Sequence, residues 1–529
     1  MYSGANRRAG GVEGAVYDGA RPPSQGLEPH TLFCTLPLRK VAASTGIAMA
    51  DTSSPARTVA IVGGGFSGTL LALKLTAARP GWRILLIDPA VRPGRGLAYG
   101  ACEPYHLLNV PAHRMETGLT PPFQAWLSGA GRPLEEALVE ADGVLADAFL
   151  PRGLLGDYLQ ERLEDARAED DGPGLATVRG EAVAMLDPPR RGVRLLDGRE
   201  IVCDLLVLAT GNLPPRAPLP QDAWLHDHPA FVPDPWARQA LTGGDPEAAV
   251  LMLGTGLTMV DVALKLAAEG QKGPMIAVSR RGLVPTPHRA GGAWSPFVAP
   301  LLPASPLMLT RAVRAAAAQA ERQGTPWQRV MDAVRPAIAR VWETWTPKQR
   351  RQFLRHLRPR WDVHRHRMAP RVAARLDALL ESAALTVLGG RVVEWTRRKG
   401  QVAARLHLRG LKTEQTMTVG RVINCTGPRS DLDRLANPLF ADLARRRLIR
   451  PDPLGLGLES DDCAVQDIDG RASDWLYAVG PLTRPALWEV TAVPEITAQI
   501  DRLTHELAQD AERPKVALAE TFIDMGAGI

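Results

Sequence analysis

Residues 59–68 read Val-Ala-Ile-Val-Gly-Gly-Gly-Phe-Ser-Gly, so a short apolar run leads directly into a cluster of glycines. A buried strand that turns into a helix through glycines spaced G-x-G-x-x-G is the usual binding site of a dinucleotide. In that pattern Gly63 permits the tight turn, Gly65 lets the backbone approach a pyrophosphate, and Gly68 lets the helix pack against the strand. The stretch therefore predicts a nucleotide site, and the alternative is a glycine-rich turn without a ligand.

The residues around this turn predict the local structure. We expect a strand over 58–62 and a helix over 66–79. Phe66 and Ser67 then lie at the N-terminus of the helix, where the phosphates of a nucleotide are stabilised.

The end of the next strand indicates which nucleotide binds at the first turn. We expect this strand over 83–88, with Asp88 as its last residue. A carboxylate in that place accepts hydrogen bonds from ribose hydroxyls and repels a 2′-phosphate. The first turn is therefore expected to bind FAD or NAD, and not NADP.

A second stretch repeats the arrangement. The apolar run 249–253 leads into Gly254 and Gly256, and we expect a helix over 257–268. Met259 stands where the third glycine would be, which removes the close packing of the helix but leaves the phosphate contact. We therefore predict a second, less regular nucleotide site.

The strand after the second turn ends differently from the one after the first. We expect it over 275–279, and it leads through Ser279 into Arg280 and Arg281 with no acid. Two guanidinium groups and a hydroxyl suit a 2′-phosphate, so the second site is predicted to bind NADPH, with NADH as the alternative. Two solvated arginines after a strand would have the same sequence.

The order of these patterns predicts an α/β protein with two Rossmann-like dinucleotide-binding domains, for FAD and NADPH, and a helical insertion. Apolar strands over 205–209 and 421–425 each run into a Thr-Gly pair, and we expect helices over about 307–382 and 491–508. The predicted parts are a disordered tail (1–55), the FAD-binding domain (56–220 and 431–529), the NAD(P)H-binding domain (221–295 and 385–430) and the helical insertion (296–384).

Several stretches together resemble the broad family of FAD/NAD(P)-binding proteins. The matching residues are 59–68, 94–100, 106–112, 151–158, 254–261, 279–283, 361–367 and 480–489. Within this family the chain is similar to a FAD-dependent urate hydroxylase and to an amino-acid N-oxygenase, and more distantly to the N-hydroxylating flavin monooxygenases. The Baeyer–Villiger fingerprint FxGxxxHxxxW is missing, so ketone oxygenation is not expected.

The resemblance implies further residues at the flavin. Thr210 and Gly211 look like the ATG segment of flavin monooxygenases, and Gly480 and Pro481 are expected beside the flavin pyrophosphate or ribityl chain. Asn109, a polar amide among apolar residues, is a candidate to contact the flavin or the nicotinamide, although capping of a turn would also explain it. It is the single candidate for a catalytic residue.

The C-terminal stretch offers more candidates. Trp488, Glu489 and Thr491 could reach the flavin ring, and packing of Trp488 in the core is the alternative.

The resemblance also implies a reaction. We expect an NADPH-dependent flavin monooxygenase in which reduced flavin and O₂ form a C4a-(hydro)peroxide that hydroxylates a small polar molecule. One alternative is a reductase that passes electrons to an acceptor without inserting oxygen. A flavin-binding redox sensor with little turnover is an alternative of another class.

The segment 361–367, Trp-Asp-Val-His-Arg-His-Arg, is the motif that this scheme leaves unassigned. Its alternation of residue types resembles a strand. Its histidines suggest a metal site, but only Asp362 would complete the ligands and arginines surround them, so we predict no metal. Binding of an anionic substrate or of the NADPH phosphates, and a structural hinge, are the remaining interpretations.

Composition excludes other classes. The 529 residues carry a net charge of +6, spread over arginine-rich helices without a nucleic-acid-binding module, and no apolar run is long enough to span a membrane. The five cysteines are scattered singly, which is typical of a reduced, cytoplasmic protein and not of a dithiol reductase. We expect a small-molecule substrate and O₂ as partners. For the N-terminal residues, a protein start at Met49 is the alternative to a disordered tail.

Overall fold

The computed structural model describes residues 57–129, 131–168, 174–215, 223–237, 239–432 and 437–510. All of them lie in one compact unit, Thr52–Ile529. The predictions made for the tail 1–55 and for a start at Met49 fall outside the described residues.

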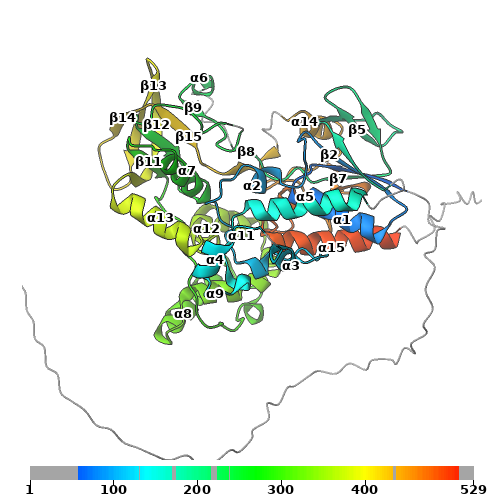
Figure 1. Ribbon diagram of the computed structural model, residues 1–529, viewed down its shortest axis with the longest axis horizontal. Helices are drawn as coiled ribbons and strands as arrows, with labels where there is room; N and C mark the ends of the chain where they lie inside the picture. The colour runs from blue at the N-terminus through cyan, green and yellow to red at the C-terminus, as the bar shows by residue number, and fades with distance from the viewer. Residues whose placement is uncertain are drawn as a thin grey trace, which may run out of the picture. The chain divides into compact units, whose positions relative to one another are not determined.

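The first sheet contains seven strands and is built around the first glycine turn. Its central strands are parallel, with Val59 opposite both Ile84 and Leu205. The helix after the turn, α1 (Phe66–Ala78), lies beside α5 (Gly153–Ala168) and α15 (Val493–Asp510) (Figure 1). In sheet order the strands are β17 (Ser460–Asp461), β18 (Ala464–Gln466), β19 (Ala472–Ala478), β7 (Leu205–Leu208), β1 (Thr58–Val62), β2 (Arg83–Asp88) and β3 (Leu175–Arg179).

The second sheet also has seven strands and contains the second glycine turn. Helix α7 (Leu257–Ala268) follows that turn, and its buried face packs with α13 (Pro370–Glu381) in one apolar cluster. The antiparallel part of this sheet was not predicted. In sheet order the strands are β14 (Gln415–Val419), β13 (Gln401–Leu408), β12 (Leu385–Arg398), β11 (Met275–Ser279), β10 (Val250–Leu253), β15 (Arg421–Asn424) and β9 (Phe231–Val232).

The predicted helical region over 307–382 is confirmed as a series of short helices with an aromatic core. Arg335 in this region forms a paired ion contact with Glu495 of α15 at 2.6 and 2.7 Å, which fastens the insertion to the C-terminal helix. Besides α13, the helices are α8 (Pro306–Arg322), α9 (Trp327–Val334), α10 (Ile338–Thr344), α11 (Pro347–Gln352), the π-helix η6 (Phe353–Leu357) and α12 (Arg358–Arg365).

The strand-like interpretation of 361–367 is wrong, because most of this segment belongs to helix α12. Pro359 stands in the first turn of α12, where proline is well tolerated, and Arg358 pairs with Asp362 one turn later at 3.4 Å. Seven residues of alternating type are too few to distinguish a strand from a helix that buries Val363 and Arg365.

The remaining elements connect these parts. Pro214 and Pro215 lie in a short strand that pairs with Pro428 and Arg429. The connecting strands are β8 (Leu213–Pro215) with β16 (Pro428–Arg429), and β4 (Ala182–Met185), β5 (Gly192–Leu195) and β6 (Glu200–Val202), which form a small antiparallel sheet. The short helices are α2 (Gly96–Gly100), α3 (Phe123–Leu127), α4 (Glu135–Glu140), α6 (Ala223–His226) and α14 (Pro438–Arg445), with 3₁₀ turns η1 (Ala112–Arg114), η2 (Leu145–Asp147), η4 (Ala299–Leu301), η5 (Arg335–Ala337) and η8 (Gly480–Thr483).

The predicted α/β class with two Rossmann-like units and a helical region is confirmed. The exact limits assigned to each part stay a prediction. Among the described residues no helix is both long and apolar enough to cross a membrane, and the four cysteines there are free.

Candidate functional site

The first glycine turn has the geometry of a phosphate-binding loop. Gly63 has φ +109°, and a Cβ atom there would collide with the carbonyl oxygen of Ala209. A Cβ on Gly68 would collide with the carbonyl oxygen of Gly63, so α1 can approach β1 only with glycine at this position. A Cβ on Gly65 would meet only the Cα of Gly96, at 3.5 Å. The turn is therefore closed behind Gly63 and Gly68 and leaves space at Gly65.

Asp88 supports this turn directly. Its Oδ2 accepts a hydrogen bond from the backbone N–H of Gly64 at 2.6 Å, and its Oδ1 accepts one from Ala90 at 2.8 Å. Each carboxylate oxygen has two lone pairs, so both oxygens retain capacity for a ribose hydroxyl. The acid predicted for the ribose thus also fixes the loop.

Thr210 and Gly211 lie behind the same turn. The Cα of Thr210 is 3.1 Å from the position of a Cβ on Gly63, and Gly211 has φ +67°. The hydroxyl of Thr210 is buried and has no hydrogen-bond partner among the described residues. A buried hydroxyl without a partner is unfavourable, and a bound polar ligand would satisfy it.

The C-terminal segment covers the start of α1. Gly480 has φ +76°, and a Cβ there would lie 2.8 Å from the hydroxyl oxygen of Ser67. Its N–H donates to Gln499 Oε1 of α15 at 2.8 Å, and half-buried Pro481 follows it. The segment that resembles a flavin-contacting stretch thus lies against the N-terminus of the helix after the first turn.

The second turn repeats the backbone arrangement of the first. Gly254 has φ +110°, and a Cβ there would collide with the carbonyl oxygen of Cys425, the counterpart of Ala209. A Cβ on Gly256 would meet no atom within 4 Å. Met259 is fully buried in the cluster beneath α7. The turn therefore keeps its open middle glycine while a methionine fills the packing position.

The three residues proposed for the 2′-phosphate do not converge. The Ser279 hydroxyl forms a hydrogen bond with Thr255 Oγ1 at 2.8 Å and stabilises the second turn. Arg281 donates to the carbonyl oxygen of His356 in η6 at 3.1 Å, and Arg280 is exposed. Arg280 is thus the member of the three whose side chain is most accessible to a ligand.

Sequence reasoning missed a polar contact between the two nucleotide-binding units. Arg152, at the start of α5, forms a two-pronged ion pair with Asp261 of α7, at 3.0 and 3.2 Å. His106 Nε2 donates to the backbone carbonyl of Asp261 at 3.1 Å, and burial lowers the pKa of His106, so the ring is neutral. Asp261 is an acidic residue within the mostly apolar helix α7, and this was the one sign in the sequence that the helix needs a polar partner.

The backbone of Asn109 is held by a histidine. Its carbonyl oxygen accepts a hydrogen bond from His288 Nε2 at 2.8 Å. Burial, together with the nearby Arg367, lowers the pKa of His288 to about 4, so the neutral ring donates its proton.

The segment 361–367 connects the insertion to the C-terminal stretch. Trp361 Nε1 donates to Glu489 Oε1 at 2.9 Å, and Arg365 Nε lies 3.1 Å from Glu489 Oε2. Burial would raise the pKa of Glu489, but Arg365 and its other cationic neighbours outweigh burial and keep it below its usual value. In the described part of the chain no three His, Cys, Asp or Glu side chains are grouped to hold a metal. These contacts agree with a structural hinge, and binding of an anionic substrate by this segment stays a prediction.

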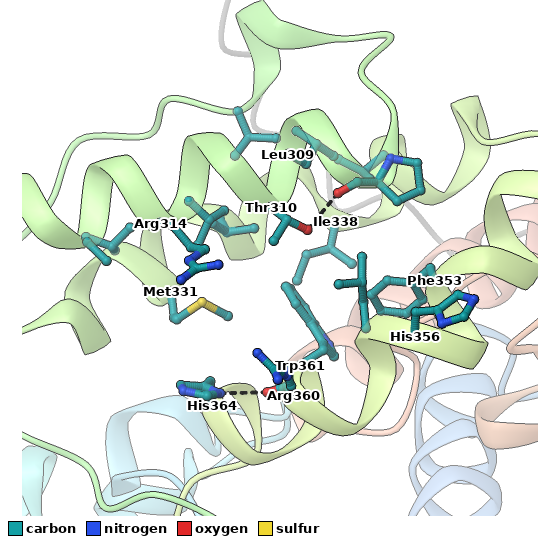
Figure 2. A pocket seen from close by; sticks show the side chains of 18 of the residues that line it. Leu309, Thr310, Arg314, Met331, Ile338, Phe353, His356, Arg360, Trp361 and His364 are labelled. Carbon is teal, nitrogen blue, oxygen red and sulfur yellow. Dashed lines mark hydrogen bonds between the residues drawn. The ribbon is translucent and has the colours of Figure 1, made fainter.

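A cavity of about 590 Å³ lies within the helical insertion (Figure 2). It lies between α8, α9, α10, η6 and α12, and Trp488 of the C-terminal stretch forms part of its wall. Trp488 also stacks on Trp342 at 4.8 Å between ring centroids. Trp361 and His364 of the segment 361–367 line this cavity, but most of its lining comes from helices without a recognised motif, so the cavity as a whole could not be predicted.

Comparisons with known proteins agree with this geometry. Residues 60–213 match a family model described as FAD-NAD(P)-binding. Comparison of the sequence with curated proteins gives no match.

Solved structures resemble the chain over most of its length. The ornithine hydroxylase of Pseudomonas aeruginosa has a TM-score of 0.58 at 15% identity, covering 87% of this chain and 100% of its own. The L-lysine 6-monooxygenase of Pseudomonas syringae has a TM-score of 0.58 at 17% identity, covering 86% of this chain and 100% of its own. The ornithine N-hydroxylase of Kutzneria sp. 744, with reduced FAD, NADP⁺ and L-ornithine, has a TM-score of 0.56 at 16% identity, covering 87% and 100%.

At these identities the likeness concerns the fold. The family model covers the first glycine turn, Asp88, Arg152 and the Thr210–Gly211 pair. Residues 60–213 therefore match the FAD-NAD(P)-binding family model, in a chain whose fold resembles that of these hydroxylases.

Proposed function

We propose that this protein is an FAD-dependent NADPH oxidoreductase that acts as a monooxygenase on a small molecule. The observation that carries the proposal is that both glycine turns are fastened to one domain. Gly480 of the returning C-terminal segment lies against Ser67 at the first turn, and Asp261 of the helix after the second turn is held by Arg152. Two nucleotides on these turns would be held by one connected body, which electron transfer between them requires.

FAD is assigned to the first turn. Gly63, Gly65 and Gly68 form the loop for the pyrophosphate, and Asp88 is placed for the ribose. The unpaired hydroxyl of Thr210 fits the polar part of the same ligand. When bound, FAD supplies the chemistry of hydride acceptance and oxygen activation, and the protein orients the reactants and excludes water.

NADPH is assigned to the second turn. The space at Gly256 admits a pyrophosphate, and β11 ends in Ser279, so the strand end lacks the carboxylate that would repel a 2′-phosphate. Arg280 is the group proposed to contact that phosphate. Asn109 and its partner His288 are proposed to lie near the nicotinamide, because the segment 106–112 reaches α7 through His106.

The monooxygenase activity is supported by the hydroxylases and the monooxygenase that share the fold. A reductase that passes electrons to an acceptor remains the second candidate. The free cysteines of the described residues support the proposal that the protein works in the reducing cytoplasm, and also disfavour a dithiol reductase.

The test is the stoichiometry of the reaction. Purified holoprotein is supplied with NADPH, O₂ and a set of small molecules, and NADPH oxidation, hydrogen peroxide and oxygenated product are measured together. One oxygenated product for each NADPH consumed supports the proposal. Stimulated NADPH oxidation that yields only peroxide or a reduced acceptor, for every compound tested, supports the reductase instead.

A further inference from the structure

We propose that the cavity in the helical insertion is the substrate site, and that its substrate is a largely apolar molecule with one anionic group. This inference rests on the proposed oxidoreductase function and defines its substrate class. It differs from the small polar substrate that the sequence resemblance implied.

The body of the cavity is apolar and aromatic. Trp342, Trp345 and Phe353 are almost completely buried in its wall, and Val330 and Met331 complete the floor from α9. A volume of about 590 Å³ is in the range of pockets that enclose a drug-sized molecule. Burial of an apolar ligand against such walls stabilises the complex by about 25 cal/mol for each Å² removed from water. The floor therefore selects an aromatic or aliphatic body.

The charges of the cavity lie at its mouth and are mainly positive. Arg314 of α8 lies on one side of the cavity, near Met331, and Arg360 of α12 lies on another side, beside Trp361 (Figure 2). Both arginines are exposed, and neither forms an ion pair with another described residue. Among the described lining residues Glu321 is the single acid, against three arginines that include Arg281. The mouth thus favours an anion over a cation.

This charge distribution disfavours amines as substrates. An ammonium group that entered the apolar floor would lose its hydration without gaining a carboxylate partner there, and such burial is strongly unfavourable. The ornithine and lysine named for proteins of the same fold carry such groups. The cavity therefore predicts a different substrate class from those proteins.

The cavity is connected to the proposed flavin site by the C-terminal stretch. That stretch begins with Gly480 against Ser67 at the first turn and continues to Trp488, which forms a wall of the cavity. Trp488 is 3% exposed, and its Nε1 has no hydrogen-bond partner among the described residues. One short segment thus contacts both the first nucleotide turn and the cavity. A substrate site must lie next to the bound flavin, and this segment connects the two.

The experiment uses two probes that differ by one charge. The holoprotein is titrated with 1-anilinonaphthalene-8-sulfonate, an anionic aromatic probe, and with N-phenyl-1-naphthylamine, its neutral counterpart, while probe and tryptophan fluorescence are followed. We expect one binding site for each, with the sulfonate bound about tenfold more tightly at low salt and losing that advantage at high salt. Equal affinity for the two probes, or binding to many sites, would overturn the inference.

Variants locate the probe. The double substitution Arg314→Gln and Arg360→Gln should weaken sulfonate binding about five- to tenfold and change binding of the neutral probe less than about twofold, because it removes charge at the mouth and leaves the floor intact. Arg311→Gln is the matched control, since Arg311 is exposed on the same helix but does not line the cavity. The same loss with Arg311→Gln would contradict the assignment.

A second variant tests the floor. Met331→Trp adds volume inside the cavity and should weaken both probes at least tenfold. If this variant does not fold, the arginine variants still test whether the probe binds in this cavity. Reduction of the wild-type flavin by NADPH is recorded separately. Loss of that reaction would refute the proposed function, whereas unselective probe binding alongside intact reduction would refute only the substrate class.

Discussion

The Arg152 guanidinium joins two nucleotide-binding units by holding the Asp261 carboxylate at 3.0 and 3.2 Å. Arg152 lies at the start of α5 beside the first sheet, and Asp261 lies in α7, directly behind the second glycine turn. The exposed fractions of the two side chains are 14% and 8%, so solvent screens the pair only weakly. The contact therefore fixes where the second turn lies relative to the first domain.

Removal of one partner of this pair should destabilise the protein and slow electron transfer. Asp261→Asn leaves Arg152 largely buried without its counter-ion, and we expect the free energy of unfolding to fall by about 3 kcal/mol. We also expect slower reduction of the flavin by NADPH, measured by stopped flow. Arg405→Ala is the control, because its ion pairs with Glu394 and Glu414 are exposed and screened by solvent, so their loss should change stability much less. Equal losses in the two variants would show that the Arg152–Asp261 contact has no special role.

The glycines of the two turns should differ in their tolerance of alanine. Gly68→Ala places a methyl group against the carbonyl oxygen of Gly63, so we expect loss of bound flavin and a lower melting temperature. Gly256→Ala meets no atom within 4 Å, so it should fold normally and weaken only NADPH binding. Flavin absorbance per protein and thermal unfolding distinguish the two outcomes. Normal flavin content in Gly68→Ala would contradict the assignment of FAD to the first turn.

The choice between NADPH and NADH should depend on Arg280. Arg280→Ala removes an exposed guanidinium at the end of β11, and we expect the KM for NADPH to rise about tenfold while the KM for NADH is unchanged. Arg281→Ala should have a smaller effect on this ratio, because Arg281 donates to the His356 carbonyl. If neither variant alters the NADPH to NADH ratio, the phosphate assignment is wrong.

Acid should destabilise the protein through His288. Burial and Arg367 lower the pKa of His288 to about 4 from an unfolded value of 6.5, so between these values the unfolded chain binds the extra proton. Stability contributed by the neutral ring is therefore complete above pH 6.5 and declines as the pH falls toward 4, by up to about 3 kcal/mol. His288→Gln retains a donor for the Asn109 carbonyl but does not titrate. Denaturant unfolding at several pH values should show that the free energy of unfolding declines less steeply with acid in the variant. Identical slopes would exclude His288 as a source of the acid sensitivity.

The local structure around both turns could be predicted from the sequence, because it depends on neighbouring residues. The strand 83–88 and the helix 257–268 were placed with the limits that the structure has, since an apolar run and its glycines define them. Gly63 and Gly254 have the left-handed conformation that such turns require. Sequence periodicity and glycine spacing are therefore sufficient to predict these strands, helices and turns.

The contacts between distant segments could not be predicted in this way. Arg152 and Asp261 belong to separate motifs, 151–158 and 254–261, and no local pattern indicates that they pair. The segment 361–367 was misread as strand-like because its helical face depends on the insertion and on Glu489. The cavity arises in the same way, since its walls come mainly from α8, α9, α10, η6 and α12, together with Trp488. Such features arise from tertiary packing, which a single sequence does not record.

The central claim, that this chain passes electrons from NADPH to bound FAD, is tested most directly by anaerobic mixing of the purified protein with NADPH while the visible absorbance of oxidised flavin is followed. We predict that the protein is isolated with, or binds, FAD at one site, and that NADPH removes this absorbance faster than NADH does. Stable FAD absorbance that NADPH and NADH both leave unchanged would contradict it.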